Sequence, residues 1–170
     1  MEIATPGDRR LSFDLGDRAW LTDAGDIPCG EVYISPIEES GEGKVLVPEV
    51  YLTGNRFDDV ELEFRRGRLV SSSESELLDQ IRSHSDDADM LAEFGIGLNP
   101  SVKRLIGHPS VDEKCGGTVH IAIGMNHLAG GNNFSSLHLD LVFPPVRVLL
   151  DGEPLMEGRR LIPLMSQRAE

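Results

Sequence analysis

Short segments in which apolar and polar residues alternate one by one place the strongest constraint on how this chain folds. The segments 11–16 and 59–64 show this pattern over their whole length. Successive side chains of a β-strand point to opposite faces of a sheet, so a period of two predicts half-buried strands. Apolar-rich segments predict further strands at 18–23, 31–35, 44–51, 69–72, 118–124, 137–143 and 146–150.

Glycine-containing turns separate these strands. Arg66-Gly67-Arg68 and Asp151-Gly152 predict hairpins, and Ala24-Gly25-Asp26 predicts a turn after the second strand. Hairpins join antiparallel neighbours. We therefore expect a β-rich, mostly antiparallel sheet that is strongly curved or barrel-like.

The middle of the chain changes character. In 73–84 the apolar residues Leu77, Leu78 and Ile81 form a stripe at helical spacing after Ser75, a residue type preferred at helix N-caps, so we expect a helix capped by Ser75. The segment 86–93 predicts a second helix or a turn, and 101–106 predicts a third short helix. Strands, then helices, then strands predict an α+β fold with two or three short helices, in a single domain over 1–170.

The charge balance excludes several kinds of partner. The chain has 29 acidic residues against 16 Lys and Arg, a formal net charge of −13, whereas nucleic-acid binding needs a basic face. It has no apolar run of the length that a membrane span requires, and its N-terminus lacks the pattern of a secretory signal. Two cysteines, Cys29 and Cys115, are too few for a disulfide framework. We expect a cytoplasmic protein with no nucleic-acid or membrane partner.

A histidine and an aspartate lie two residues apart in the apolar segment HLDLVF. Because the period of a strand is two, His138 and Asp140 share one face of the sheet, while Leu139 and Leu141 point to the other. An imidazole and a carboxylate that meet at one point form a ligand pair for a divalent metal. The alternative is a structural pair in which the histidine is hydrogen-bonded to a buried aspartate.

Three further polar residues stand among apolar neighbours. Glu31 opens an apolar strand, Glu93 lies in LAEFGIG, and His120 lies in TVHIAIG. A carboxylate in apolar surroundings costs desolvation free energy unless a cation compensates it. Together with His138 and Asp140, these residues form a set of three carboxylates and two imidazoles suited to two metal ions. Taken singly, each also fits the polar face of its strand or helix.

A glycine-rich loop follows His120. Gly130 and Gly131, followed by Asn132, allow the backbone to approach a ligand closely. The same residues also fit an ordinary connection between two strands.

Four blocks of the sequence carry a resemblance to a known family. They are PCGEVYISPIEES, LAEFGIGLNP, DEKCGGTVHIAIG and GGNNFSSLHLDLVF. In this order they resemble the catalytic half of the metallo-aminopeptidases of the aminopeptidase T, or thermophilic metalloprotease, type. The resemblance extends from about Leu11 to Leu155, and each block holds a polar residue of the kind that the family uses at its metals.

The resemblance implies a centre with two divalent metal ions, reported in the family as zinc, cobalt or manganese. In such a centre the metal polarises a peptide carbonyl and activates the water that attacks it, and the α-amine of the substrate also binds there. The implied function is a metal-dependent aminopeptidase that releases N-terminal residues from a peptide substrate. The implied metal ligands are Glu31, Glu93 as the bridging residue, His120, His138 and Asp140.

The resemblance also implies roles for other residues and marks two departures. His127 stands seven residues after His120, where the family typically has a tyrosine, and we expect it to be catalytic by stabilising the tetrahedral intermediate. Family members also carry an N-terminal domain ahead of this region, which we expect to be absent here, and they form homodimers. The remaining expected site residues are Glu31, as a second catalytic residue, and Gly130, Gly131 and Asn132, as substrate-binding residues.

Two other functions fit the same residues. His120, His138 and Asp140 form a set of two histidines and one carboxylate, which binds iron(II) in oxygenases, so a mononuclear iron(II) ring-cleaving dioxygenase is an alternative. Glu93 argues against it, because the dioxygenases of the wider family lack the bridging glutamate. A non-catalytic metal-binding module is the third hypothesis.

Overall fold

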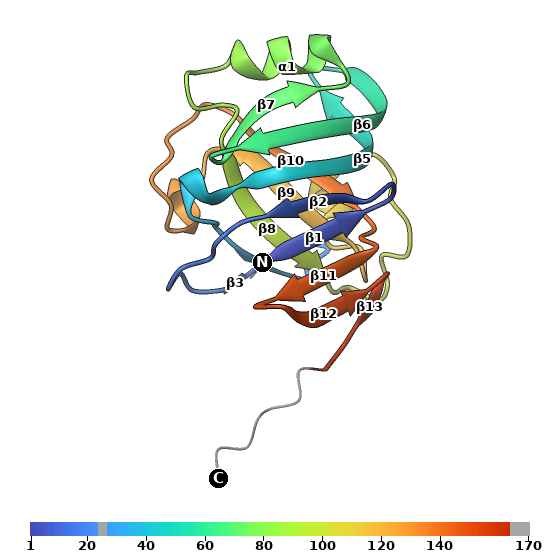
Figure 1. Cartoon of the computed structure of the whole chain (residues 1–170). Helices are drawn as coiled ribbons and strands as arrows, with labels where there is room; N and C mark the ends of the chain where they lie inside the picture. The colour runs from blue at the N-terminus through green and yellow to red at the C-terminus, as the bar shows by residue number, and fades with distance from the viewer. Residues whose placement is uncertain (24–26, 164–170) are drawn as a thin grey trace.

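Two antiparallel β-sheets face each other across one apolar core (Figure 1). The computed structural model describes residues 1–23 and 27–163, and the turn expected at Ala24-Gly25-Asp26 lies outside the described residues. The larger sheet has the strand order β13-β12-β11-β1-β2-β5-β6-β7, and the smaller has the order β10-β9-β8-β4-β3. The pairings between these strands are antiparallel. The predicted β-rich, antiparallel fold is confirmed.

The larger sheet contains β1 (Glu2–Thr5), β2 (Arg9–Ser12), β5 (Glu42–Leu52), β6 (Asn55–Arg65), β7 (Arg68–Ser72), β11 (Arg147–Leu150), β12 (Glu153–Glu157) and β13 (Arg160–Leu161). The smaller sheet contains β3 (Leu21–Thr22), β4 (Glu31–Ile34), β8 (Leu91–Gly97), β9 (Val119–Gly124) and β10 (His138–Phe143). The described residues also form the helices α1 (Ser75–Arg82) and α2 (Pro109–Asp112) and the 3₁₀ turns η1 (Glu38–Ser40) and η2 (His127–Ala129). In these ranges, no helix has the length and apolar character needed to cross a bilayer.

The two sheets meet at one corner without closing into a barrel. An isolated antiparallel bridge between Arg68 and Met90 joins β7 to the start of β8. Over the described residues the larger sheet ends at β13 on one side and at β7 on the other, and α1 lies over β7 (Figure 1). The term barrel-like therefore describes the observed pair of open sheets only loosely.

The predicted hairpins are confirmed where the sequence places glycine in a turn. Asp151 and Gly152 connect β11 to β12, and both have positive φ angles, of 52° and 83°. Arg66 and Gly67 connect β6 to β7 with φ angles of 48° and 72°. Turns with two positive φ angles match the right-handed twist of the paired strands, and glycine adopts this conformation without a steric cost.

The predicted helices are only partly confirmed. The helix expected in 73–84 is α1, but its N-cap is Glu74 and Ser75 is already helical, so the predicted cap is wrong. The segment 86–93 is a turn that leads into β8, so the helical alternative there is wrong as well.

The helix expected at 101–106 does not form, because nearby side chains bind the backbone instead. The side-chain oxygen of Asn99 accepts a hydrogen bond from the Ser101 N–H at 2.8 Å, and the Asp112 carboxylate accepts from the Ile106 N–H at 2.8 Å. Side chains that bind the backbone locally compete with helix formation. The short helix α2 starts later, with a proline at its first position.

The register of the smaller sheet gives it one apolar face and one largely polar face. Phe94, Ile121 and Leu141 form a cross-strand row on β8, β9 and β10, and all three are buried in the core shared with the larger sheet. Side chains at neighbouring positions point the opposite way. On that opposite face the rows are Glu93–Ala122–Asp140 and Gly95–His120–Val142.

One irregularity in β8 makes this arrangement possible. Leu91 pairs with Ile123 and Glu93 pairs with Ala122, so the register shifts by one residue and Ala92 is left between the two pairs. An extra residue of this kind reverses the facing of the residues that follow it. Leu91 therefore stays in the core, whereas Glu93 points to the polar face.

Candidate metal centre

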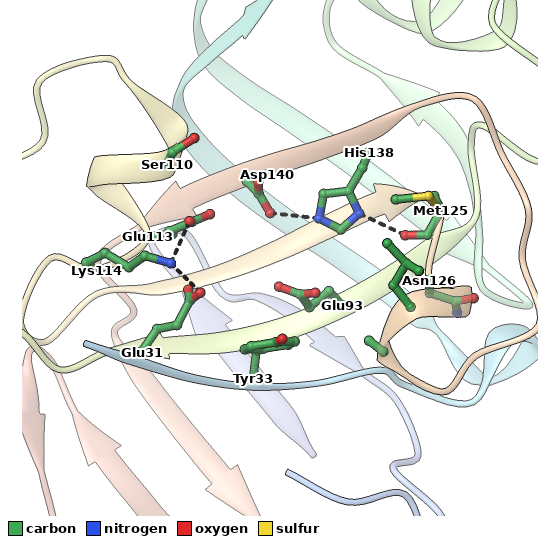
Figure 2. A pocket seen from close by; sticks show the side chains of 12 residues that line it. Glu31, Tyr33, Glu93, Ser110, Glu113, Lys114, Met125, Asn126, His138 and Asp140 are labelled. Carbon is green, nitrogen blue, oxygen red and sulfur yellow. Dashed lines mark hydrogen bonds and ion pairs between the residues drawn. The ribbon is translucent and has the colours of Figure 1, made fainter. Parts of the chain in front are cut away.

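Four neighbouring strands bring the five predicted metal ligands to one face of the smaller sheet. Glu31 comes from β4, Glu93 from β8, His120 from β9, and His138 and Asp140 from β10. Figure 2 shows Glu31, Glu93, His138 and Asp140 directed into a common cavity of about 310 Å³. The prediction that His138 and Asp140 share a face is confirmed, since their side chains approach to 3.3 Å.

The innermost group consists of Glu93, His120 and Asp140. One donor atom from each lies within 4.8 Å of the others, and Nε2 of His120 is 3.2 Å from Oε1 of Glu93. Oε2 of Glu31 lies 3.5 Å from the same nitrogen. His120 has no solvent-exposed surface. Burial alone would lower the pKa of its imidazole, but the hydrogen bond to Glu93 and the charges of Asp140 and Glu31 outweigh it and raise the pKa.

His138 is oriented by a backbone carbonyl. Its Nδ1 lies 2.8 Å from the carbonyl oxygen of Met125, and because a carbonyl oxygen can only accept, Nδ1–H is the donor. Nε2 then faces Oδ1 of Asp140. A histidine held by one nitrogen in this way presents the other to a metal. Burial alone would lower the pKa of His138, but the contact with Asp140 raises it to about 9, and the same contact keeps the pKa of Asp140 low against the effect of its burial.

Small residues clear the space above the polar face. Gly95 lies directly opposite His120 in the register, and a Cβ atom at this position would overlap the imidazole ring. Ala122 separates Glu93 from Asp140 in the neighbouring row. Because larger side chains are missing at these two positions, the donor atoms can converge.

A buried lysine, which was not predicted, lies at one end of the cavity. The side chain of Lys114 is 2% exposed. Its Nζ donates a hydrogen bond to Oε1 of Glu31 and lies 2.8 Å from Oε1 of Glu113 (Figure 2). It also lies 3.5 Å from Oδ2 of Asp23. Burial alone would lower the pKa of Lys114, but the hydrogen bonds to Glu113 and Glu31 outweigh it and raise the pKa. The side chain is therefore an ammonium ion at neutral pH.

The two glutamates around this lysine respond to burial in the same direction. Burial raises the pKa of Glu31, and the charges of His120 and Lys114 oppose the shift only in part. Burial, together with the charge of Asp140, raises the pKa of Glu113 to about 7 in spite of its contact with Lys114. Near neutral pH the Glu113 carboxyl group can therefore exchange protons.

The sequence contained a signal for one of the missed residues and none for the others. Tyr33, which lines the cavity, follows Glu31 by two positions on β4 and so shares its face. Glu113 and Lys114 lie in the loop after α2, outside any strand. Lys114 is 83 residues from Glu31 along the chain, and only the tertiary fold brings these two together.

The predicted catalytic and substrate-binding residues of the 127–132 segment lie beside the cavity. His127 is in η2, where its ring stacks on Phe134 with the centroids 4.7 Å apart. Gly131 donates its N–H to the carbonyl of Asn126 at 3.0 Å, and the N–H of Asn132 donates to Glu38 at 2.7 Å. The cavity wall itself is formed by their neighbours in the same loop, Asn126, Leu128 and Ala129.

The donor atoms on this face fit a divalent cation. Oε2 of Glu31 is buried and has no hydrogen-bond partner among the described residues, and Oδ1 of Asp140, also buried, has only the 3.3 Å ion-pair contact with His138 there. A buried carboxylate oxygen without a partner carries a desolvation cost that a cation would remove. The mixture of imidazole nitrogen and carboxylate oxygen suits zinc, manganese, cobalt or iron(II).

Comparison with known families decides the relationship of the chain. A model of the family described as thermophilic metalloprotease (M29) matches residues 17–145, which include all five predicted ligands. The chain belongs to this family. The resemblance of its four blocks to metallo-aminopeptidases is thereby confirmed, and no curated protein matches the sequence significantly.

Two solved structures share the fold of this M29 chain. The structure of 2,5-dihydroxypyridine dioxygenase from Pseudomonas putida KT2440 has a TM-score of 0.78 at 17% identity, over 98% of this chain and 56% of that protein. The structure of wild-type AmpT from Thermus thermophilus has a TM-score of 0.70 at 21% identity, over 95% of this chain and 49% of that protein. The M29 chain thus spans about half the length of either structure.

Proposed function

We propose that this chain is a metal-dependent aminopeptidase that releases N-terminal residues from peptides. The observation that carries the proposal is the convergence of Glu93, His120 and Asp140 within 4.8 Å in a cavity, in a chain of the M29 family. His138, held by the Met125 carbonyl, and the free oxygen of Glu31 add two further donors.

These residues would hold zinc, cobalt or manganese. When bound, such a cation would polarise the scissile carbonyl and lower the pKa of the attacking water. The family resemblance implies two ions bridged by Glu93. The contacts of Glu31 limit the number of metal ions it can bind, because Oε1, one of its two carboxylate oxygens, accepts a hydrogen bond from Lys114.

Glu31 is the proposed general base. Its Oε2 is buried without a hydrogen-bond partner among the described residues, and burial raises the pKa of its carboxyl group above the usual value for glutamate. A carboxylate tuned in this way can take a proton from water and return it to the leaving amine. The hydrogen bond from Lys114 to Oε1 fixes the orientation of the carboxylate and leaves Oε2 available.

The substrate would bind with its α-amine toward the carboxylates and its first side chain toward the loop wall. The wall contributes the apolar side chains of Met125 and Leu128. We propose that His127, Gly130, Gly131 and Asn132, which flank this wall, contact the peptide beyond its first residue. His127 is the proposed hydrogen-bond donor to the tetrahedral intermediate.

The test is hydrolysis of unblocked amino-acid anilides and short peptides by the protein loaded in turn with zinc, cobalt and manganese. We expect release of the N-terminal residue from free peptides and none from N-acetylated ones. Glu93→Gln should lower kcat/KM by about 100-fold or more. Glu63→Gln, a matched control on β6 of the other sheet, should leave it unchanged. If no metal supports hydrolysis, or Glu93→Gln matches the wild type, the proposal is wrong.

A ring-cleaving iron(II) dioxygenase is the second candidate, because His120, His138 and Asp140 provide the two histidines and one carboxylate that iron(II) oxygenases use. The similar fold of the Pseudomonas dioxygenase agrees with it, whereas the presence of Glu93 beside the three ligands argues against it. Oxygen uptake by the iron-loaded protein with a dihydroxypyridine would favour this candidate. Metal binding with neither activity would favour a non-catalytic metal-binding module.

We also propose a cytoplasmic location and a homodimeric state. The free thiols of Cys29 and Cys115 support the location, and the family resemblance supports the dimer. Gel filtration with light scattering tests the dimer directly.

A further inference from the structure

Lys114 is a fixed cation on the ligand-bearing face. Its Nζ contacts carboxylates of Glu31, Glu113 and Asp23, which come from three different segments of the chain. Its backbone is held as well, because its N–H donates to the carbonyl of Val111 at 3.2 Å and its carbonyl accepts the Asn99 N–H at 2.9 Å. With both ends held and the side chain 2% exposed, Lys114 cannot turn out to solvent without opening the loop.

Lys114 compensates the charge of one implied metal ligand, Glu31, together with the charges of Glu113 and Asp23. Four acidic groups, Glu31, Glu93, Glu113 and Asp140, line the cavity, and a fifth, Asp23, contacts Lys114 beside it. Buried carboxylates require compensating positive charge. Lys114 supplies this charge to Asp23, Glu31 and Glu113. Glu93 and Asp140, with His120 between them, remain free to hold one ion. A second divalent ion close to a buried ammonium would be repelled strongly in such a low-dielectric site.

We propose that the ammonium group of Lys114 takes the place of a second metal ion, so that the centre holds one divalent cation at Glu93, His120 and Asp140. This inference rests on the proposed metal dependence of the protein. It changes the role of Glu31, which becomes a base oriented by Lys114 and contributes at most one oxygen to the metal.

Stoichiometry tests the proposal without any activity measurement. The full chain is freed of metal with a chelator, titrated with Mn²⁺ in a calorimeter, and analysed for bound manganese after gel filtration. We expect about one ion per chain. About two ions per wild-type chain would overturn the role of Lys114 and leave the proposed aminopeptidase intact. No binding would overturn both.

Substitution of the lysine provides the second arm. Lys114→Met removes the charge at similar length and frees Glu31 and Glu113, so we expect about two Mn²⁺ per chain. Lys114→Arg keeps the charge and should remain at about one. Lys44→Met, at a half-exposed lysine paired with Glu61 on the larger sheet, is the matched control and should also remain at one. A single ion in a folded Lys114→Met protein contradicts the proposal.

Glu113→Gln covers the case in which Lys114→Met does not fold. If Glu113 binds Lys114 and not a metal, this variant keeps one Mn²⁺ per chain with an affinity within about threefold of the wild type. If Glu113 is a metal ligand, the affinity falls by about tenfold or more or a binding site is lost, and the proposal is wrong.

Discussion

At the scale of single residues, His138 links the protonation of the centre to the stability of the fold. Its pKa is raised from 6.5 to about 9 by Asp140. A group whose pKa rises on folding stabilises the folded state fully below its unfolded pKa, and this contribution is lost as the pH rises through the folded value. We therefore expect the free energy of unfolding of the metal-free protein to fall by about 2 kcal/mol between pH 6.5 and pH 9.

Urea denaturation in the presence of a chelator measures this dependence. The raised pKa of Glu113, about 7, adds a decrease in the same direction at lower pH. His138→Asn should flatten the profile above pH 7 and leave the lower part in place. A wild-type profile that is flat or rising over the upper range would contradict the pairing of His138 with Asp140.

Residue patterns predicted which side chains share the face of the candidate site and missed the charged groups that contact them. The period of two in β10 was sufficient to place His138 and Asp140 on one face, because strand geometry alone fixes that relation. The same rule applied to β4 would have found Tyr33 beside Glu31. Lys114 was not predictable, since two of its three carboxylate partners, Asp23 and Glu31, reach it only through long-range folding.

At the scale of elements, the close approach of β8 to β9 holds the imidazole of His120 in place. An alanine at Gly95 would place its Cβ inside the ring of His120, so the ring must leave its present position beside Glu93. We expect Gly95→Ala to lower the free energy of unfolding by about 1–3 kcal/mol and to weaken Mn²⁺ binding by about tenfold or more.

The control for this variant is Gly54→Ala in the turn between β5 and β6. A Cβ atom there has no heavy atom of the described residues within 4 Å, although the φ angle of 83° makes the substitution strained. It should lower the stability and leave the Mn²⁺ affinity unchanged. Equal affinities in Gly95→Ala and the wild type would show that the imidazole does not depend on this contact.

The loop that carries η2 is held against the rest of the fold by Glu38. The Glu38 carboxylate accepts hydrogen bonds from the side chain of Asn126 at 3.1 Å and from the N–H of Asn132 at 2.7 Å, and it pairs with Arg18 at 2.8 Å. Since Asn126 lines the cavity, we expect Glu38→Gln to raise KM by about fivefold with a smaller change in kcat. Glu39→Gln, an exposed neighbour, should change neither. A fall in kcat alone would contradict this role.

The sequence pattern did not predict the strand β8, and the structure shows why. The extra residue Ala92 interrupts the alternation in LAEFGIG, so the segment 86–93 matched a helix or a turn better than a strand. A strand that is buried on both faces, as β8 is, also lacks the polar positions that mark alternation. The sequence block LAEFGIGLNP therefore identified Glu93 as a candidate site residue, but the strand that carries it was not predicted.

At the scale of the whole molecule, the negative charge of the chain should favour binding of a positively charged group, such as the N-terminal ammonium of a peptide. The net charge is −13, and the cavity is lined by Glu31, Glu93, Glu113 and Asp140. A field of this sign attracts the α-ammonium group of a peptide. We expect KM for unblocked peptides to rise several-fold between about 0.05 M and 0.5 M NaCl, with kcat nearly constant, because salt screens this attraction.

Steady-state kinetics with two peptides that differ only in a lysine or a glutamate at the second position provide the comparison. The lysine peptide should show the larger salt effect. Identical salt dependence for both peptides would mean that the overall field does not contribute to binding.

The fold class was predictable because it depends on periodicity and turns, which are local. The antiparallel character, the hairpins at Gly67 and Gly152 and the site strands β4, β9 and β10 follow from these signals, whereas β8 does not. The division into two sheets was not predictable, since it depends on which strands pair at a distance, such as β1 with β11. The prediction of a helix at 101–106 was wrong because the side chain of Asp112 accepts a hydrogen bond from the backbone of this segment.

Because of the register shift at Ala92, single-residue deletions at different positions of β8 should affect the candidate site differently. The carbonyl of Ala92 accepts its hydrogen bond from the hydroxyl of Ser35 at 2.9 Å, outside the ladder with β9. Loss of Ala92 would restore regular pairing and leave Glu93 and Gly95 facing the cavity. Loss of Phe94 would make Glu93 and Gly95 adjacent and turn them to opposite sides. Length variation among relatives should therefore be found at position 92 and be absent at position 94.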